Sequence, residues 1–152
     1  MLPHISLSPL TSLKEPIGHP SWVCELKHDG FRGVLYLDRD PAWLVSRKGK
    51  KFRQFEPLLK QVLRCPKGQS VILDGEIAVL DEKGRSNFHD LMARGGEPRY
   101  YAFDLVWLNG RDLRGSRFWT ASGGLHRLIP HLLRVDHLDG DELRFFSSSF
   151  CS

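Results

Sequence analysis

The chain has 152 residues, a formal net charge of +4, and apolar and charged fractions of 41% and 26% that are typical of a globular protein. This length suits one compact domain. We exclude a membrane protein, because no apolar run reaches the roughly 18 residues that span a bilayer. The three cysteines lack the spacing of a zinc site or a disulfide framework, and the first residues lack a secretory signal. We therefore expect a cytoplasmic protein whose modest positive charge does not by itself identify a partner.

An extended lead-in is expected at residues 1–21, which contain four prolines separated by Ser, Thr and Gly. The domain proper is expected at 22–145, followed by an irregular tail at 146–152. Branched and aromatic residues predict the first strands at 22–27, 33–37 and 42–46.

A helix is predicted over 55–63, because apolar residues there recur at the spacing of one helix face and a proline and a glycine follow. Strands are expected at 71–73 and 77–80 on either side of a polar insertion. Residues 81–84 then have the composition of a turn.

A short helix is predicted over 87–93, and residues 100–108 are rich in the aromatic and branched types of strands. Asn109-Gly110 is typical of a tight hairpin turn, and a last helix is expected at 125–133. Because consecutive strands are joined by short turns, the fold class expected is α+β, with mainly antiparallel sheets and flanking helices.

A lysine stands in the most distinctive local pattern, Glu25-Leu26-Lys27-His28-Asp29-Gly30-Phe31-Arg32, where a strand is expected to end and a loop to begin. A neutral lysine is a nitrogen nucleophile that can attack phosphorus. Gly30 permits close approach to a ligand, and Arg32 can hold a phosphate or a sugar hydroxyl with its planar guanidinium. Taken alone, the pattern fits a charged surface turn equally well.

Two carboxylates interrupt an apolar stretch at Asp74-Gly75-Glu76. They could bind a ribose hydroxyl or help to hold Mg²⁺, which prefers oxygen ligands. A strand-edge turn capped by Asp74 is the simpler interpretation of these residues alone.

Phe103 and Asp104 lie inside a strand that is otherwise apolar. A buried carboxylate is costly unless it is paired or faces a ligand. Phe103 could stack on a base, although core packing is the commoner role of a strand phenylalanine.

Four cations, Arg47, Lys48, Lys50 and Lys51, follow the strand expected at 42–46. They suit contacts with the phosphates of DNA. A solvated hairpin tip would have the same composition, so both interpretations stay open.

Taken in order, segments 27–32, 46–49, 74–77 and 101–105 resemble motifs I, Ia, III and IIIa of covalent nucleotidyltransferases. From Trp22 to Gly115 the sequence is most similar to bacterial ATP-dependent DNA ligases, including the ligase module of end-joining enzymes. The resemblance implies the N-terminal part of an adenylation domain with an incomplete ATP-grasp-like nucleotidyltransferase fold.

The resemblance also implies a reaction in which a lysine attacks the α-phosphate of ATP, the AMP passes to a 5′-phosphate of DNA, and the 3′-hydroxyl displaces AMP to seal the strand. Lys27 would be the adenylated nucleophile, Arg47 would contact phosphate or sugar, Glu76 would hold the ribose or assist a metal ion, and Phe103 would stack on adenine. The implied nucleotide-binding residues are Glu25, Arg32, Arg47, Glu76 and Phe103. ATP and Mg²⁺, or another divalent cation, are the implied cofactors, and nicked or broken duplex DNA is the implied partner.

The sequence has no counterpart of the family's motifs IV and V or of its oligonucleotide-binding barrel. Residues 117–124 also depart from the family's pattern. We therefore expect a truncated domain with little or no activity of its own, with a separate chain as one source of the missing groups. The alternatives are a non-catalytic nucleotide-binding or DNA-binding remnant, an RNA ligase or capping-type nucleotidyltransferase, and a fragment that does not fold stably.

Overall fold

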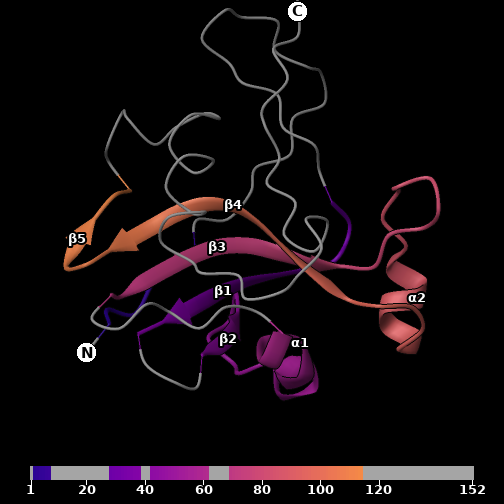
Figure 1. Cartoon of the computed structure of the whole chain (residues 1–152), viewed down its shortest axis with the longest axis horizontal. Coiled ribbons are helices and arrows are strands. Elements are labelled where there is room, and N and C mark those ends of the chain that lie inside the picture. The colour runs from indigo at the N-terminus through magenta and orange to yellow at the C-terminus, as the bar shows by residue number, and fades with distance from the viewer. Residues whose placement is uncertain (1, 8–27, 39–41, 62–68, 115–152) are drawn as a thin grey trace, which may run out of the picture.

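A single antiparallel sheet organises residues 2–7, 28–38, 42–61 and 69–114, which are the residues that the computed structural model describes (Figure 1). The sheet has five strands in the order β2-β1-β3-β4-β5, and each neighbouring pair is antiparallel. The elements, in chain order, are β1 (Phe31–Leu37), β2 (Trp43–Ser46), a 3-10 turn η1 (Arg53–Phe55), α1 (Glu56–Gln61), β3 (Val71–Ala78), α2 (Phe88–Ala93), β4 (Arg99–Leu108) and β5 (Arg111–Asp112). The antiparallel sheet expected from the sequence is confirmed.

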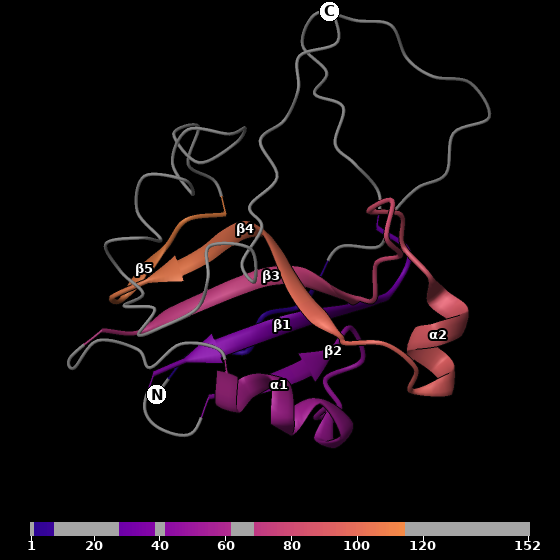
Figure 2. The ribbon, with the colours of Figure 1, turned by 45° about the vertical axis from the view of Figure 1, so that its right-hand side comes forward.

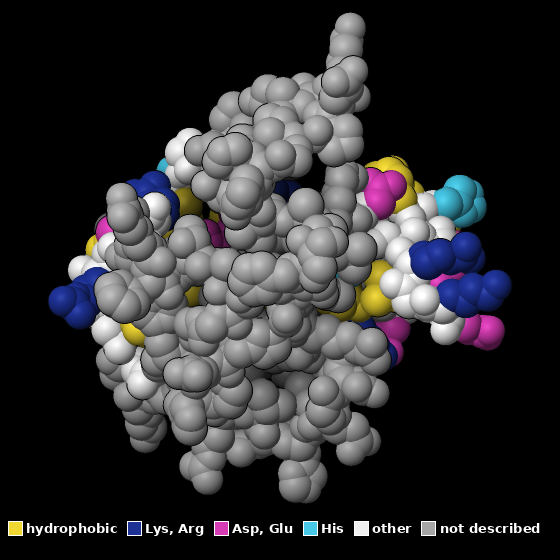
Figure 3. All heavy atoms as spheres, turned by 90° about the horizontal axis from the view of Figure 1, so that it is seen from above, with side chains coloured by type: hydrophobic (Ala, Val, Ile, Leu, Met, Phe, Trp, Pro, Cys, Tyr) yellow, Lys and Arg dark blue, Asp and Glu magenta, His cyan; other side chains and the backbone are white. Residues whose placement is uncertain are grey.

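The two α-helices lie at different places along the sheet. In both ribbon views α1 lies beside β2, and α2 lies beyond the end of the sheet at which β4 begins (Figures 1 and 2). Basic, acidic and histidine side chains gather at the right-hand end of the molecule in Figure 3, the end at which α2 lies in Figure 1. No helix among the described residues is long and apolar enough to cross a membrane.

Side chains of successive strand residues point to opposite faces of the sheet, and both faces are partly covered. On the first face, leucines of β1, β2, β3 and β4 pack with Phe55, Leu58 and Leu91 from the helical segments. The apolar face predicted for the helix at 55–63 is therefore confirmed at its described end.

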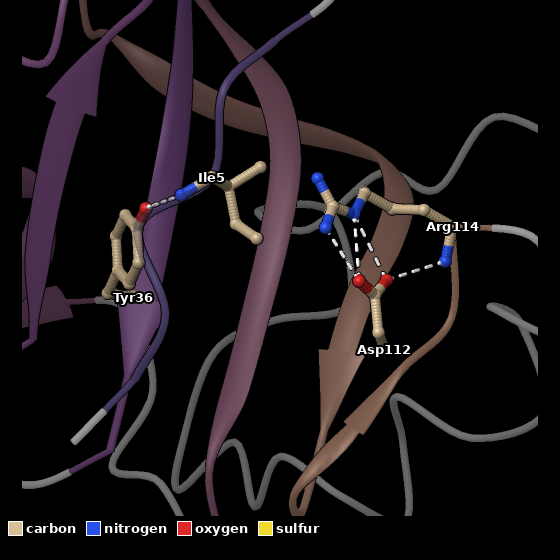
Figure 4. Close-up of polar contacts among 4 residues, drawn as sticks. All are labelled: Ile5, Tyr36, Asp112 and Arg114. Atoms are coloured by element: carbon tan, nitrogen blue, oxygen red, sulfur yellow. Dashed lines mark hydrogen bonds and ion pairs between the residues drawn. The ribbon is translucent and has the colours of Figure 1, made fainter.

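The second face is divided into an apolar half and a polar half. In the apolar half, Val34, Tyr36, Ile72 and Val106 pack beneath Ile5. The hydroxyl of Tyr36 accepts a hydrogen bond of 3.1 Å from the backbone amide of Ile5, as Figure 4 shows. Residues 2–7 form neither helix nor strand, yet they cover this half of the sheet.

The polar insertion expected between two strands at 71–73 and 77–80 is wrong. β3 runs without interruption from Val71 to Ala78, and Asp74, Gly75 and Glu76 pair with both neighbouring strands. Because β3 is a central strand, its backbone groups are satisfied by two ladders, which explains why it tolerates the glycine and two charges. The strand-edge turn capped by Asp74 is wrong for the same reason.

Strand β1 begins at Phe31, two residues before the expected start at residue 33, so Arg32 lies in the sheet and not in a loop. The other described elements differ from expectation by small shifts at their ends. The helix at 87–93 begins at Phe88, with Asn87 as its N-cap, and the Asn109-Gly110 turn connects β4 to β5. The strand at 22–27, the helix at 125–133 and the tail at 146–152 lie outside the described residues, and the domain boundaries stay predictions.

Tyr100 crosses the central strands on the first face. Its hydroxyl lies 2.9 Å from the carbonyl oxygen of Gly33 in β1 and 3.1 Å from that of Leu73 in β3. Burial raises the pKa of Tyr100 well above its ordinary value, so the hydroxyl keeps the proton that it donates. The ring can cross β3 because Gly75 has no side chain: an added Cβ would lie 2.6 Å from Cζ of Tyr100 and overlap the carbonyl oxygen of Tyr101.

We predict that Gly75→Ala lowers the free energy of unfolding by about 3 kcal/mol, because the new methyl group must displace the Tyr100 ring or the β4 backbone. Gly95→Ala is the matched control, since its Cβ would meet its nearest neighbour at an ordinary 3.7 Å, and it should change stability by less than about 0.5 kcal/mol. Urea denaturation of both variants provides the measurement. Equal stabilities would contradict this packing.

Candidate active site

The polar half of the second face brings together four of the residues singled out from the sequence. Arg32 in β1 is directly opposite Glu76 in β3, and Asp74 lies two residues further along β3 on the same face. Asp104 in β4 is opposite Asp74. One arginine and three carboxylates thus share one end of this face.

Arg32 and Asp74 form a bidentate ion pair. Nε of Arg32 donates to Oδ1 of Asp74 at 3.2 Å, and Nη2 donates to Oδ2 at 2.7 Å. The Asp74 side chain is 6% exposed and that of Arg32 is 21% exposed, so both are largely removed from water. The hydrogen bonds that Arg32 donates to Asp74 raise the pKa of Arg32 despite its burial, and the guanidinium stays charged.

Phe103 occupies an irregular position in β4. The register passes from Asp74 opposite Asp104 to Gly75 opposite Ala102, so Phe103 is the extra residue of a bulge. A bulge redirects a side chain, and the Phe103 ring is 37% exposed. The guanidinium carbon of Arg32 lies 5.6 Å from the centroid of this ring, within the range of a cation–π contact. Core packing, the commoner role, is therefore wrong for Phe103.

Glu76 connects the sheet to the segment that precedes β1. Its Oε1 accepts a hydrogen bond of 2.9 Å from the backbone amide of Gly30. Any side chain at Gly30 would overlap the carbonyl oxygen of Ile77, so this close approach of backbone to β3 requires glycine. The sequence predicted a close approach at Gly30, but toward a ligand and not toward β3.

His28, directly before this segment, is 7% exposed. Its ring stacks on Tyr101 of β4, with 4.7 Å between centroids and 17° between planes. Its Nδ1 lies 3.2 Å from the hydroxyl oxygen of Ser86. Burial lowers the pKa of His28 below its ordinary value, which favours the neutral imidazole at neutral pH.

The cations at 47–51 form the tip of a hairpin. A backbone hydrogen bond of 2.8 Å from Gly49 to Ser46 closes the turn, and Arg47, Lys48, Lys50 and Lys51 are exposed. Ser46 pairs with Gly33, the neighbour of Arg32. Arg47 therefore follows the last paired residue of β2, near the end of β1 that carries Arg32, and its side chain is exposed to solvent.

Lys27 and Glu25 lie outside the described residues, so the nucleophile assignment and the nucleotide contact of Glu25 stay predictions. Within the described part of the chain, no cluster of three or more His, Cys, Asp or Glu side chains is placed to hold a metal ion. Glu76 as a metal ligand stays a prediction.

A family model for the ATP-dependent DNA ligase domain matches residues 6–131 of this chain. Most of the chain, including all four motif segments, lies within that match. The chain therefore belongs to the ATP-dependent DNA ligase family, and its matched part corresponds to the adenylation domain.

Relatives with known names agree with this family. The multifunctional non-homologous end joining protein LigD of Mycobacterium bovis is 36% identical over 124 residues, or 76% of this chain. LigD of Pseudomonas aeruginosa is 33% identical over 141 residues, or 90% of this chain. The matched region is 16% of each of these relatives. The chain thus spans a small part of the length of the LigD proteins that it matches.

Solved structures give the same result. A mycobacterial DNA ligase D complexed with ATP and MES superposes with a TM-score of 0.56 and 29% identity, covering 72% of this chain and 36% of that one. The ligase domain of LigD from M. tuberculosis superposes with a TM-score of 0.51 and 33% identity, covering 62% of this chain and 32% of that one.

The sequence did not reveal the importance of His28 or the partner of Asp74. A signal for Asp74 was present, because a carboxylate inside an apolar strand requires a partner, but the partner, Arg32, is 42 residues away. His28 gave no signal of its own, since both of its contacts come from segments more than fifty residues away.

We predict that Asp74→Asn lowers the free energy of unfolding by about 2 kcal/mol, because it leaves the half-buried Arg32 without its carboxylate. Arg32→Met combined with Asp74→Asn should recover part of this loss, giving a coupling energy of at least about 1 kcal/mol in a double-mutant cycle. Urea denaturation of the four proteins provides the energies.

The matched control is Asp112→Asn at the exposed pair with Arg114, drawn in Figure 4, which has a similar bidentate geometry with a shortest distance of 2.6 Å. Hydrogen bonds from Arg114 lower the pKa of Asp112 to about 2. Solvent screens this pair, so its loss should be clearly smaller. A loss as large as that of Asp74→Asn would show that burial does not set the strength of the Arg32–Asp74 pair.

Proposed function

We propose that this chain carries the nucleotide-binding face of a DNA ligase adenylation domain and transfers AMP from ATP to Lys27. The proposal rests on four residues that lie together at one end of one sheet face: Arg32, Asp74, Glu76 and Phe103. Arg32 follows Lys27 by five residues in the sequence. A related DNA ligase D that is 29% identical has been solved in complex with ATP. We also propose that the complete domain has the ATP-grasp-like nucleotidyltransferase fold.

In this reaction the neutral amine of Lys27 attacks the α-phosphorus of ATP. The bond between lysine nitrogen and phosphorus forms as the bond from phosphorus to the pyrophosphate oxygen breaks, and pyrophosphate leaves. Phosphoryl transfer of this kind depends mainly on positioning and on cations around the phosphates. Arg32 is suited to both, because Asp74 fixes the orientation of its guanidinium while the charge is retained.

The remaining nucleotide contacts follow from the same face. The exposed ring of Phe103 offers an aromatic surface on which adenine can stack. Glu76 would bind the ribose, and Arg47 would contact phosphate or sugar from the adjacent hairpin. Glu25, outside the described residues, keeps its predicted nucleotide contact.

A divalent cation such as Mg²⁺ would neutralise charge on the phosphates and is usually bound by one or two protein carboxylates together with substrate phosphates. Glu76 fits this limited requirement, because it is a partly exposed carboxylate beside Arg32. Its Oε1 accepts a hydrogen bond from the Gly30 amide, and both the ribose role and the metal role of Glu76 stay proposals.

We propose nicked or broken duplex DNA as the partner, with Lys48, Lys50 and Lys51 at its phosphates. Several relatives are named as non-homologous end joining proteins, and the hairpin that carries these lysines is exposed. Completion of joining would also use the groups of the family's motifs IV and V, and a separate chain is one proposed source of them.

We predict that incubation with α-labelled ATP and Mg²⁺ labels the protein covalently, but only weakly, because the sequence has no counterpart of the family's motif V. Lys27→Arg should abolish the label, because the guanidinium is always protonated and is not a nucleophile. Lys83→Arg, in the exposed turn before Ser86, is the matched control and should be labelled like the natural sequence. Gel electrophoresis under denaturing conditions measures the label, and peptide mass spectrometry locates it. Label retained by Lys27→Arg would refute the nucleophile assignment, and label from GTP in preference to ATP would favour a capping-type enzyme.

We also predict salt-sensitive binding to nicked duplex DNA. If Lys50 contacts one phosphate, Lys50→Gln should reduce the slope of log affinity against log salt concentration by about 0.9, whereas Lys83→Gln should leave it unchanged. Fluorescence anisotropy with labelled DNA gives both slopes. Binding without any AMP labelling would favour the non-catalytic remnant.

A further inference from the structure

His28 is a buried histidine with no assigned role in the proposed adenylation reaction. It is the residue directly after the predicted nucleophile Lys27 in the chain. Its ring is fixed from two directions, by the stack on Tyr101 at 4.7 Å and by the contact of Nδ1 with Ser86 at 3.2 Å. A buried imidazole with two specific contacts restricts the backbone that carries it.

The two partners of His28 are themselves held firmly. Tyr101 is 1% exposed and lies in β4 opposite Glu76. Ser86 pairs with Leu80 across the turn at 81–85, which is closed by a 2.9 Å hydrogen bond from the Asp81 amide to the Arg85 carbonyl. His28 is therefore anchored to the sheet and to a closed turn.

The residues that follow His28 are fixed as well. The Gly30 amide donates to Glu76, and the Gly30 backbone approaches β3 too closely for any side chain. Strand β1 begins one residue later, at Phe31. The chain thus has a defined direction from His28 into the sheet.

We propose that His28 is a positioning residue for Lys27, because its contacts with Tyr101 and Ser86 hold the backbone of the residue that directly follows the lysine. This inference rests on the proposed transfer of AMP to Lys27. Small displacements of a reacting group reduce the rate strongly, since the near-attack geometry is lost. The burial that keeps the imidazole neutral also lets it stack against Tyr101 without the cost of a buried charge.

Two substitutions separate the two contacts. His28→Phe keeps a ring to stack on Tyr101 and loses the nitrogen that meets Ser86, whereas His28→Gln keeps a polar group and loses the ring. His89→Gln is the matched control, because the His89 side chain is 91% exposed on α2. The experiment measures the single-turnover rate of covalent labelling by α-labelled ATP, as a function of ATP concentration.

We expect the maximal labelling rate to fall about tenfold in His28→Gln and about threefold in His28→Phe. The half-saturating ATP concentration should change by less than about twofold, because positioning of the nucleophile acts on the chemical step and not on ATP binding. Ser86→Ala should match His28→Phe, and the double variant should be no slower than either, since all three lose the same contact. A lowered melting temperature with an unchanged maximal rate, or an effect confined to ATP binding, would overturn the proposal.

A second measurement separates this inference from the proposed function. Trace acetylation without ATP, followed by mass spectrometry, gives the reactivity of Lys27 relative to Lys83 in the same protein. This ratio should change by at least about threefold in His28→Gln and not in His89→Gln, because the reactivity of an amine depends on its surroundings. If the natural sequence takes no label, adenylyl transfer fails and the acetylation ratio alone decides on positioning. If the natural sequence is labelled and His28→Gln is labelled equally fast, positioning fails and transfer stands.

Discussion

The packing of the Tyr100 ring across Gly75 is the constraint on which the described structure depends. The ring links three neighbouring strands, because Tyr100 belongs to β4 while its hydroxyl reaches carbonyl oxygens of β1 and β3. In a sheet, a shift of one residue moves every side chain to the opposite face. By fixing the register of these strands, the contact also decides that Asp74 and Glu76 lie on the other face, beside Arg32.

On the second face, burial of charged groups in the polar half destabilises the fold, and burial of apolar groups in the other half stabilises it. Ile5, Val34, Tyr36, Ile72 and Val106 exclude water from one half, and burial of apolar surface is the main favourable term in folding. The other half keeps an arginine and three carboxylates together, which is costly unless each charge has a partner. The bidentate Arg32–Asp74 pair satisfies the most buried of them. This half of the face is charged and partly open, and use of it for a nucleotide agrees with the family to which the chain belongs.

The site residues were largely identifiable from the sequence as types, and their arrangement was not. Arg32, Glu76 and Phe103 were selected by their motifs, and the structure brings Arg32 beside both of the others. The exposed side of Phe103 depends on a bulge in β4, and a bulge is a property of strand pairing that one strand's sequence does not encode clearly. Arg47 and its neighbouring lysines lie at an exposed tip, as local composition indicated. Lys27 and Glu25 lie outside the described residues, and their roles stay predictions.

The sequence by itself determined the α+β class, the antiparallel strands, the helix faces at Phe55 and Leu58, and the Asn109-Gly110 turn, because these follow from local periodicity and turn chemistry. It also determined the family, since ordered motifs can be compared without coordinates. Only the tertiary structure decided that Asp74-Gly75-Glu76 is part of a continuous central strand, that Arg32 belongs to β1, and that His28 is buried against Tyr101 and Ser86. Each of these depends on a contact or a strand ladder between residues that are far apart in the sequence, such as His28 and Ser86 or Arg32 and Glu76. Local preferences do not carry that information, because the free energy of a buried charge or ring is set by the neighbours that the fold brings to it.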